Sequence, residues 1–362
     1  APASGHNNNR ADAAGLKQRL PFGIQGGKSM KRFLIGSYAP EGEPSIFGVG
    51  LDEEKQKLRL LWEDGQVQNP SFLYLHPNCH VLYAVEERVP NGGLSVMIKT
   101  EEGWLLKERL LAGSAPCHLE MTPDARYLLV SNYMDGTIGV YRADESGMNV
   151  VQTDLVRHQG KGVNPTRQEG PHVHSCLVIG EKIYSADLGL DTIFVYELNP
   201  ADGKLEECGQ IHMPDGCGVR HLAHQLGSPY LYANAEMGGD VFVIDLRDGQ
   251  IKQTHRVVPA DFSEAFRTSA IKISKGYVCV SSRECNVLAI MKIQNDGMLE
   301  APFIYPYAQK TPRDIFFDEK YVITTDEGSK SLTLLSLDEH MRINQRDRLL
   351  LGNAMPTCIQ PV

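Results

Sequence analysis

The feature that most constrains the fold of this chain is a short phrase that recurs along it. Each copy combines small residues or proline with a polar side chain, and β-rich runs separated by turns follow it. The copies align at positions 70, 116, 171, 219, 269, 312 and 356, so the spacings are 46, 55, 48, 50, 43 and 44 residues. A period of roughly 40 to 50 residues is typical of repeat proteins whose units pack side by side.

The third repeat shows what one unit contains. Four runs rich in β-branched and aromatic residues, bounded by Asp, Asn, Gly or Pro, are expected to be strands: 117–121, 126–132, 137–141 and 150–153. Later repeats carry matching second and third runs at 230–234 with 240–244, and at 277–282 with 287–290. No long segment has a helical period. Four strands per repeat predict an all-β fold, a seven-bladed β-propeller.

The two ends of the chain complete the predicted ring. Residues 31–61 hold only three strands of a first unit, and residues 354–362 hold a single opening strand. We expect residues 358–362 to pair into the first blade and close the ring, because closure removes the exposed edges of an open array. Residues 30–362 are therefore predicted to form one propeller domain. Residues 1–29 are rich in Asn, Ala and Gly and lack the apolar core of a signal peptide, so we interpret them as a mobile leader or cloning remnant.

Composition argues against several classes of function. The formal net charge of −9 disfavours nucleic-acid binding, which needs clustered Lys and Arg. No apolar run reaches the roughly 18 residues of a membrane helix. The eight cysteines form no CxxC pair, which favours reduced, buried thiols over disulfides or a zinc site. We therefore expect a cytoplasmic protein.

Polar side chains gather at one end of the predicted blades. In a blade of four antiparallel strands, the innermost strand starts at the rim to which the second strand returns, so these two places lie close together near the central channel. The starts of the innermost strands carry His118, His172, His174, Arg220, His221, Ser269, Arg313 and Asp314. The ends of the second strands carry Glu86, Asn132, Tyr133, Asp187, Asn234, Glu236, Arg283 and Asp326. We predict a ligand site at this rim.

Structural roles would also explain many of these side chains. His118 or His221, taken alone, could be a hydrogen-bonded structural histidine. Glu236 could be the anionic partner that Arg220 and Arg283 require in a channel, which would make all three structural. Turn capping would account for Asn132, Asp187 and Asp326.

The pair His172 and His174 could bind a metal ion, because strand alternation would place both rings on one face. A third ligand is not apparent in the sequence, and a cage for a hard cation would need more carboxylates. We therefore predict no metal and no cofactor.

Several phrases carry a family resemblance. The most specific is residues 160–175, which read Gly-Lys-Gly-Val-Asn-Pro-Thr-Arg-Gln-Glu-Gly-Pro-His-Val-His-Ser. Further matching phrases are 115–119, 131–133, 187–189, 218–222, 234–236, 282–283 and 311–314. Together they resemble the lactonase family of seven-bladed propellers, which includes the bacterial propeller-type 6-phosphogluconolactonase and fungal muconate-lactonizing cyclases. The sequence departs from the usual family phrases at Val219, which stands in place of proline, and at Ser282, which stands in place of asparagine.

The resemblance implies a lactone or muconate site made from the polar rim, with His172 or His174, Arg220, Glu236 and Arg283 in it. We predict metal-independent hydrolysis of a sugar lactone, in particular 6-phosphogluconolactone to 6-phosphogluconate. Glu236 or His174 would position the water, and Arg220 would polarise the lactone carbonyl. The predicted substrate-binding residues are His172, Arg283, Arg167, His118, His221, Arg313 and Asn132, and the predicted catalytic residues are His174, Glu236 and Arg220.

Further expectations concern the approach of the substrate and the rival functions. The loop at 157–161 would add positive charge that steers a small anionic lactone toward the rim. The sequence has no GxSxG phrase, so covalent acyl-enzyme chemistry has no support. The alternatives are a muconate lactonizing enzyme, a metal-dependent sugar lactonase and a noncatalytic interaction scaffold. We expect a monomer or a weak homo-oligomer.

Overall fold

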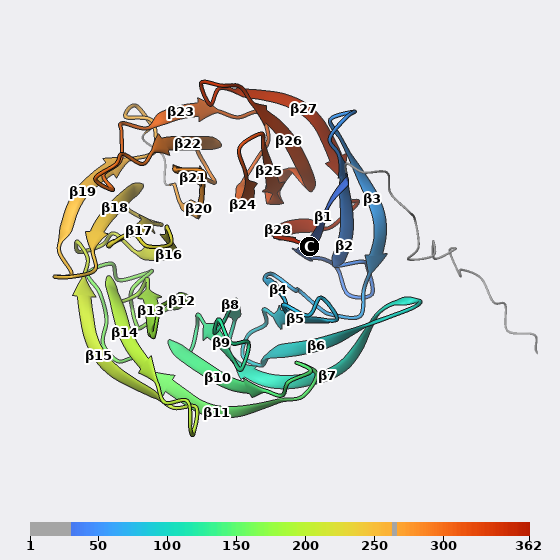
Figure 1. Cartoon of the computed structure of the whole chain (residues 1–362), viewed down its shortest axis with the longest axis vertical. Helices are drawn as coiled ribbons and strands as arrows, with labels where there is room; N and C mark the ends of the chain where they lie inside the picture. The colour runs from blue at the N-terminus through green and yellow to red at the C-terminus, as the bar shows by residue number, and fades with distance from the viewer. Residues whose placement is uncertain (1–29, 263–265) are drawn as a thin grey trace, which may run out of the picture.

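The computed structural model describes residues 30–262 and 266–362. In it, seven four-stranded antiparallel sheets surround a central axis (Figure 1). From the axis outward, the strands of the first four blades are: blade 1, β28 (Met355–Pro361), β1 (Met30–Tyr38), β2 (Ile46–Asp52) and β3 (Lys57–Asp64); blade 2, β4 (Leu73–Leu75), β5 (Val81–Glu86), β6 (Gly92–Thr100) and β7 (Gly103–Gly113); blade 3, β8 (Pro116–Met121), β9 (Tyr127–Asn132), β10 (Thr137–Ala143) and β11 (Val150–Arg157); blade 4, β12 (Val173–Ile179), β13 (Lys182–Asp187), β14 (Thr192–Leu198) and β15 (Leu205–His212).

The remaining three blades follow the same order from the axis outward: blade 5, β16 (Val219–His224), β17 (Tyr230–Ala235), β18 (Asp240–Asp245) and β19 (Ile251–Arg256); blade 6, β20 (Thr268–Ser274), β21 (Tyr277–Ser282), β22 (Val287–Lys292) and β23 (Phe303–Pro306); blade 7, β24 (Pro312–Phe317), β25 (Tyr321–Asp326), β26 (Ser331–Leu337) and β27 (Ile343–Leu350). The helical element of the described residues is the short 3-10 turn Glu327–Ser329. The predicted seven-bladed propeller is confirmed, and none of its described helices could cross a membrane.

The ring is closed by the last strand of the chain. β28 pairs antiparallel with β1 in a register that runs from Phe33 opposite Pro361 to Tyr38 opposite Met355. The first blade is therefore assembled from both ends of the described chain, as the sequence predicted. The interpretation of residues 1–29 as a leader or remnant falls outside the described residues.

The middle strands are buried because each blade is covered on both faces by its neighbours. All six residues of β5 and of β9 are buried. The outermost strands instead consist mainly of exposed and partly buried positions, as in β7 and β11. Each apolar cluster draws on two adjacent blades, for example Phe33 and Leu51 of blade 1 with Ile323 and Leu334 of blade 7. This packing explains why the second and third runs of each repeat are nearly continuous apolar stretches.

A β-bulge recurs in the innermost strands, and it positions the site. In five blades the pairing register between the two inner strands skips one residue near the same rim, and the skipped residues are Cys117, His174, Arg220, Arg313 and Thr357. In blade 6 the register skips from Thr268 to Ile271. A bulge leaves its extra residue out of the ladder and redirects that side chain. All five single skipped residues line one cavity on the axis.

Candidate active site

The axial cavity is the place where the blades bring their polar side chains together. Its wall is formed by Ser71, Phe72, Cys117, His174, Arg220, His221, Arg313, Asp314 and Thr357. The space open to the centre of a water molecule is only about 20 Å³, which is room for about one ordered water. A sugar-sized ligand therefore requires side chains at this rim to move.

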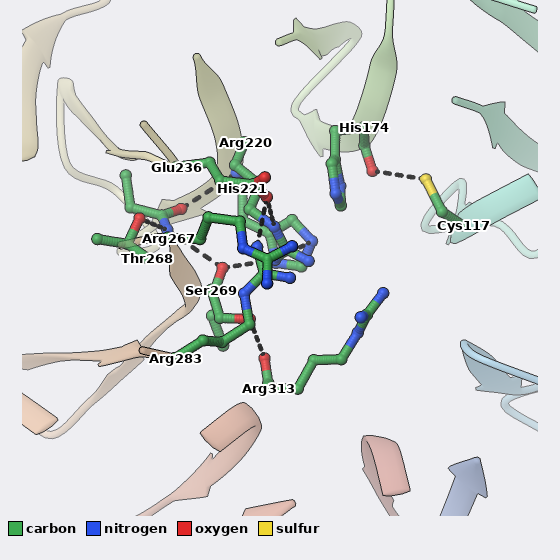
Figure 2. A network of polar contacts seen from close by, with 12 residues as sticks. Cys117, His174, Arg220, His221, Glu236, Arg267, Thr268, Ser269, Arg283 and Arg313 are labelled. Carbon is green, nitrogen blue, oxygen red and sulfur yellow. Dashed lines mark hydrogen bonds and ion pairs between the residues drawn. The ribbon is translucent and has the colours of Figure 1, made fainter. Parts of the chain in front are cut away.

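Glu236 is held by three arginines. Its Oε2 atom accepts a hydrogen bond from Arg220 Nε at 2.9 Å and lies 2.7 Å from Arg283 Nη2. Its Oε1 atom accepts a hydrogen bond from Arg167 Nη2 at 2.6 Å. The side chains of Glu236, Arg220 and Arg283 are no more than 5% exposed, whereas that of Arg167 is 34% exposed. Figure 2 shows Arg220, Arg283 and Glu236 meeting at the axis, with His174 and Arg313 across the cavity.

This cluster carries more positive than negative charge. Burial by itself raises the pKa of Glu236, but Arg283 and Arg220 outweigh that effect and hold the pKa well below its ordinary value. Burial lowers the pKa of Arg283 to about 10, although Glu236 acts in the opposite direction. The Nε atom of Arg283 is buried and has no hydrogen-bond partner among the described residues. Of these four side chains Arg220 belongs to the wall of the axial cavity, and the other three lie behind it. One carboxylate for three guanidinium groups leaves the cluster with a net positive charge.

Three histidines from neighbouring blades meet beside the arginines. The ring centroid of His221 lies 5.4 Å from that of His118 and 5.2 Å from that of His174. Desolvation lowers the pKa of His118 to about 3, helped by the charges of Lys272 and Arg220. It also holds the pKa values of His174 and His221 well below 6.5, again with Arg220 contributing. All three rings are therefore neutral at pH 7.

These neutral rings differ in their hydrogen bonding. The Nε2 atom of His221 lies 3.1 Å from Arg220 Nη1, so it accepts a hydrogen bond. The Nδ1 atoms of His118 and His174 are buried and have no partner among the described residues. His174 thus has a ring nitrogen without a hydrogen-bond partner among the described residues, next to Arg220.

Arg313 lies on the same cavity but has its own partners. Its Nη1 atom donates to Glu327 at 3.0 Å and its Nη2 atom donates to the Tyr38 hydroxyl at 2.9 Å. The Tyr38 hydroxyl in turn donates to Glu87 at 2.7 Å. Arg313 therefore carries less uncompensated charge than the group around Glu236.

His172 is held outside the cavity wall. Its ring stacks on Tyr133 at a centroid distance of 4.4 Å, its Nδ1 donates to the Tyr133 carbonyl at 3.0 Å, and its Nε2 lies 3.2 Å from Glu169. The expected strand alternation does not apply to the pair, because His172 precedes β12 and His174 is the bulged residue. Among the described residues, no group of three His, Cys, Asp or Glu side chains could hold a metal ion.

Two other predicted positions have roles within the blades. Asn132 is fully buried, and its amide donates to the Ala112 carbonyl and to the Thr137 hydroxyl, both at 3.0 Å. Asp187 accepts hydrogen bonds from the backbone N–H groups of His172 and Leu190. Asp187 therefore caps a turn, as the structural explanation expected, whereas Asn132 joins β9 to the neighbouring blade and to β10. Neither side chain belongs to the wall of the axial cavity.

The expected contribution of the 157–161 loop to charge steering is wrong for His158. Its side chain is buried, with Nδ1 2.7 Å from Asp187 and Nε2 2.8 Å from the Tyr196 hydroxyl. A histidine enclosed in this way is part of the blade interior and cannot attract a substrate from solution. Arg157 remains exposed and donates to the Asp135 carbonyl.

Several wall residues were missed as site residues by sequence reasoning: Ser71, Phe72, Cys117 and Thr357. A signal for most of them was present, because Ser71, Cys117, Arg220, Arg313 and Thr357 each follow an aligned position of the repeat directly. The Sγ atom of Cys117 lies 3.4 Å from the His174 carbonyl (Figure 2). Burial raises the pKa of the Cys117 thiol, so this cysteine is an inert wall group rather than a nucleophile.

Comparison with known proteins agrees with the fold. The chain is 28% identical over 320 residues to the 6-phosphogluconolactonase of Bacillus subtilis (strain 168), covering 84% of this chain and 90% of that protein. The structure of the periplasmic gluconolactonase of Pseudomonas aeruginosa superposes with a TM-score of 0.85 at 23% identity, covering 92% of this chain and 99% of that one. A protein from Lactobacillus plantarum superposes with a TM-score of 0.83 at 24% identity, covering 92% and 99%.

The family model described as "Lactonase, 7-bladed beta-propeller" matches residues 32–360, which is nearly the whole described ring. The sequence phrases on which the resemblance was noted lie within that range, and they supply the axial arginines and histidines. The chain belongs to the lactonase family of seven-bladed β-propellers.

Proposed function

We propose that this protein hydrolyses 6-phosphogluconolactone to 6-phosphogluconate without a metal ion. The observation that carries the proposal is the group of Arg167, Arg220 and Arg283 on one buried carboxylate, Glu236, beside the neutral ring of His174. An anionic substrate would supply the negative charge that this cluster lacks. The relation to the B. subtilis 6-phosphogluconolactonase supports this substrate.

In this proposal His174 acts as the general base. A water held at its Nδ1 atom gives up a proton to the ring as its oxygen attacks the lactone carbonyl carbon. The approaching anion reduces the field of Arg220, which otherwise depresses the pKa of His174, and so makes the ring more basic when the substrate is bound. The resulting imidazolium then returns the proton to the ring oxygen of the lactone as the C–O bond breaks.

Arg220 stabilises the tetrahedral oxyanion in this scheme. It is buried and held in place by Glu236 and by the Ser269 carbonyl, so it is preorganised before the substrate arrives. A preorganised donor of this kind accelerates the reaction by a factor of roughly 10² to 10³. Glu236 serves as a positioning residue rather than a base, because both of its oxygens are already occupied by arginines.

Arg283 and Arg167 would hold the phosphate. Arg283 offers its buried, unpartnered Nε atom. Arg167 is the most exposed of the three arginines on Glu236, so we expect it to swing away on substrate entry and to close again over the phosphate. This movement would open the small cavity to a sugar-sized ligand.

The test is a comparison of three substrates with the purified chain: 6-phosphogluconolactone, unphosphorylated gluconolactone and a carboxylated muconolactone. The proposal predicts the highest kcat/KM for the phosphorylated lactone, unchanged after treatment with a chelator. Preference for the muconolactone would favour the muconate-type alternative. Hydrolysis of all three substrates no faster than in buffer would contradict the proposed activity and favour a noncatalytic scaffold.

A further inference from the structure

A wider cavity lies at the same rim as the axial cavity, where blades 7, 1 and 2 meet. We call it the outer cavity, and its wall includes Tyr38, Asn69, Lys330, Asn353 and Met355. About 610 Å³ is open to water centres here, against about 20 Å³ at the axis. The outer cavity therefore has the size of a small-molecule site, which the axial cavity alone does not.

The outer cavity and the axial cavity have adjoining walls. At three places a residue of the outer wall lies within two positions of a residue of the axial wall or contacts it: Met355 with Thr357, Asn69 with Ser71, and Tyr38 with Arg313. The third contact is a hydrogen bond of 2.9 Å from Arg313 Nη2 to the Tyr38 hydroxyl. This hydrogen bond lies between the two cavities, so a ligand that extends from one into the other must replace it.

The hydrogen bonds at this point restrict what can replace the Tyr38 hydroxyl. That hydroxyl accepts from Arg313 and donates to Oε2 of Glu87 at 2.7 Å. Burial raises the pKa of Tyr38, so the hydroxyl keeps its proton at pH 7. A group that takes over both bonds has to accept from a guanidinium and donate to a carboxylate. A sugar hydroxyl does both, whereas an ionised carboxylate only accepts.

The charges on this side of the axial cavity differ from those around Glu236. Arg313 lies across the cavity from that cluster (Figure 2). It donates to Glu327 at 3.0 Å, and the carboxylate of Glu87 is one hydrogen bond further away. With the exposed Lys330 of the outer wall, two cations face two carboxylates. The excess positive charge therefore lies on the Glu236 side, and the Arg313 side suits an uncharged polar group.

The rest of the outer wall suits a polyol. Asn69 is partly buried, and the amide of Asn353 is exposed and donates to Glu43 at 3.1 Å. Side-chain amides both donate and accept, as hydroxyl groups do. Met355 adds an apolar surface for the C–H groups of a sugar ring.

We propose that Arg313 and Glu87 bind a hydroxyl group of the lactone substrate, which displaces the hydroxyl of Tyr38. Further hydroxyl groups of the ligand lie in the outer cavity, and its anionic group lies toward the cluster around Glu236. The inference rests on the proposed function for the lactone group at the axis. It defines the substrate class as polyhydroxylated lactones, which a muconolactone without hydroxyl groups does not fit.

Two lactams that resist hydrolysis provide the test. D-glucono-δ-lactam carries the hydroxyl groups of the sugar, and δ-valerolactam has the same ring without them. We would titrate the full chain with each and follow binding by NMR. The wild type should bind the gluconolactam more tightly by roughly tenfold or more, because its hydroxyl bonds to charged partners.

The Glu87→Ala variant removes the acceptor of that hydroxyl. It should raise the Kd of the gluconolactam by roughly tenfold and leave the Kd of δ-valerolactam unchanged. Glu41→Ala is the matched control, because it removes an exposed carboxylate from the same rim outside the outer wall, and it should change neither Kd. An equal loss for both lactams in Glu87→Ala would show a structural role and overturn the proposal.

Tyr38→Phe tests the displacement itself. The variant removes the competing hydroxyl and leaves Arg313 and Glu87 with unsatisfied groups that the ligand can bind, so the Kd of the gluconolactam should fall. A higher Kd for the gluconolactam alone would show that Tyr38 binds the ligand directly, which would overturn the displacement.

Hydrolysis of 6-phosphogluconolactone, measured on the same samples, separates this inference from the proposed function. Hydrolysis by a wild type that binds both lactams equally would overturn the hydroxyl site and leave the proposed function standing. Selective binding of the gluconolactam without hydrolysis would overturn the proposed function and support the hydroxyl site.

Discussion

The Nε atom of Arg220 donates a hydrogen bond of 2.9 Å to Oε2 of Glu236, and both side chains are almost completely buried. Arg220 is the bulged residue of β16, and Glu236 follows β17 directly, so one blade supplies both. Arg283, from the next blade, reaches the same oxygen at 2.7 Å. Glu236 therefore links two blades and at the same time holds Arg220 at the wall of the axial cavity.

Glu236→Gln should destabilise the protein, because it leaves Arg220 and Arg283 buried without their counter-charge. Removing one partner of a buried pair costs about 3 to 5 kcal/mol, so the melting temperature should fall by several degrees. Inorganic phosphate should restore part of the loss by replacing the missing anion. Glu101→Gln, at an exposed turn, is the control. It should change neither the melting temperature nor the effect of phosphate on it. A variant that melts like the wild type would contradict the structural importance of this carboxylate.

The same carboxylate has a predictable pH dependence. Its pKa is depressed in the folded protein, so its contribution to stability is present above the ordinary value near 4.5 and is lost as the pH falls through the folded value. Wild-type stability should therefore decline in acid more steeply than that of Glu236→Gln, as measured by urea unfolding between pH 6 and pH 3. Parallel curves would argue against the depressed pKa.

His118 adds a second acid-sensitive contribution. Its folded pKa is about 3, so between pH 6.5 and pH 3 the unfolded chain binds one more proton at this residue and stability falls with decreasing pH. His118→Gln should reduce the fall in the free energy of unfolding between pH 7 and pH 5, whatever its effect at pH 7. An unchanged slope would show that the pKa of His118 is the same in the folded and unfolded states.

His174→Asn should lower kcat by roughly 10² to 10³, which is within the range of general base catalysis, with little change in KM. His172→Asn is the matched control, because His172 is held by Tyr133 and Glu169 outside the cavity wall, and it should lower kcat by less than about tenfold. Steady-state kinetics on 6-phosphogluconolactone separates the two. A larger loss in the His172 variant would reverse the assignment of the base.

Arg167→Ala should raise the KM for 6-phosphogluconolactone by roughly tenfold or more, because a charge-assisted contact to the phosphate is lost. The KM for unphosphorylated gluconolactone should change little, since it carries no group for this arginine. Comparing the two substrates on the same variant removes any effect on protein concentration or folding. Equal effects on both would show that Arg167 does not contact the phosphate.

The architecture could be predicted from the sequence because it depends on features that recur. The spacing of the repeats predicted seven blades, which the structure has. The incomplete unit at residues 31–61 and the single strand at 354–362 predicted that the last strand, β28, pairs with β1 and closes the ring. Arg220, Arg283 and Glu236 were expected at one rim because the start of one strand and the end of the next must coincide there. That reasoning requires only topology, and the structure confirms that these three side chains meet.

The details that decide chemistry depend on tertiary contacts that no local pattern contains. The bulge at His174 breaks the strand alternation that was expected to place it beside His172. The loop at 157–161 was expected to add positive charge, but His158 within it is buried against Asp187, 29 positions further along the chain. Arg167 reaches Glu236 across 69 positions from a loop rather than from a strand. Each case depends on packing between blades, which the sequence shows only indirectly.

We propose that the buried Arg220 stabilises the oxyanion of a lactone at the axis of the ring. The most direct test is the single-turnover rate of 6-phosphogluconolactone hydrolysis by the wild type and by Arg220→Lys, with the melting temperature of each recorded. The account predicts a wild-type rate well above that of buffer and a loss of roughly 10² to 10³ in the variant. A folded variant that hydrolyses the lactone as fast as the wild type would contradict it.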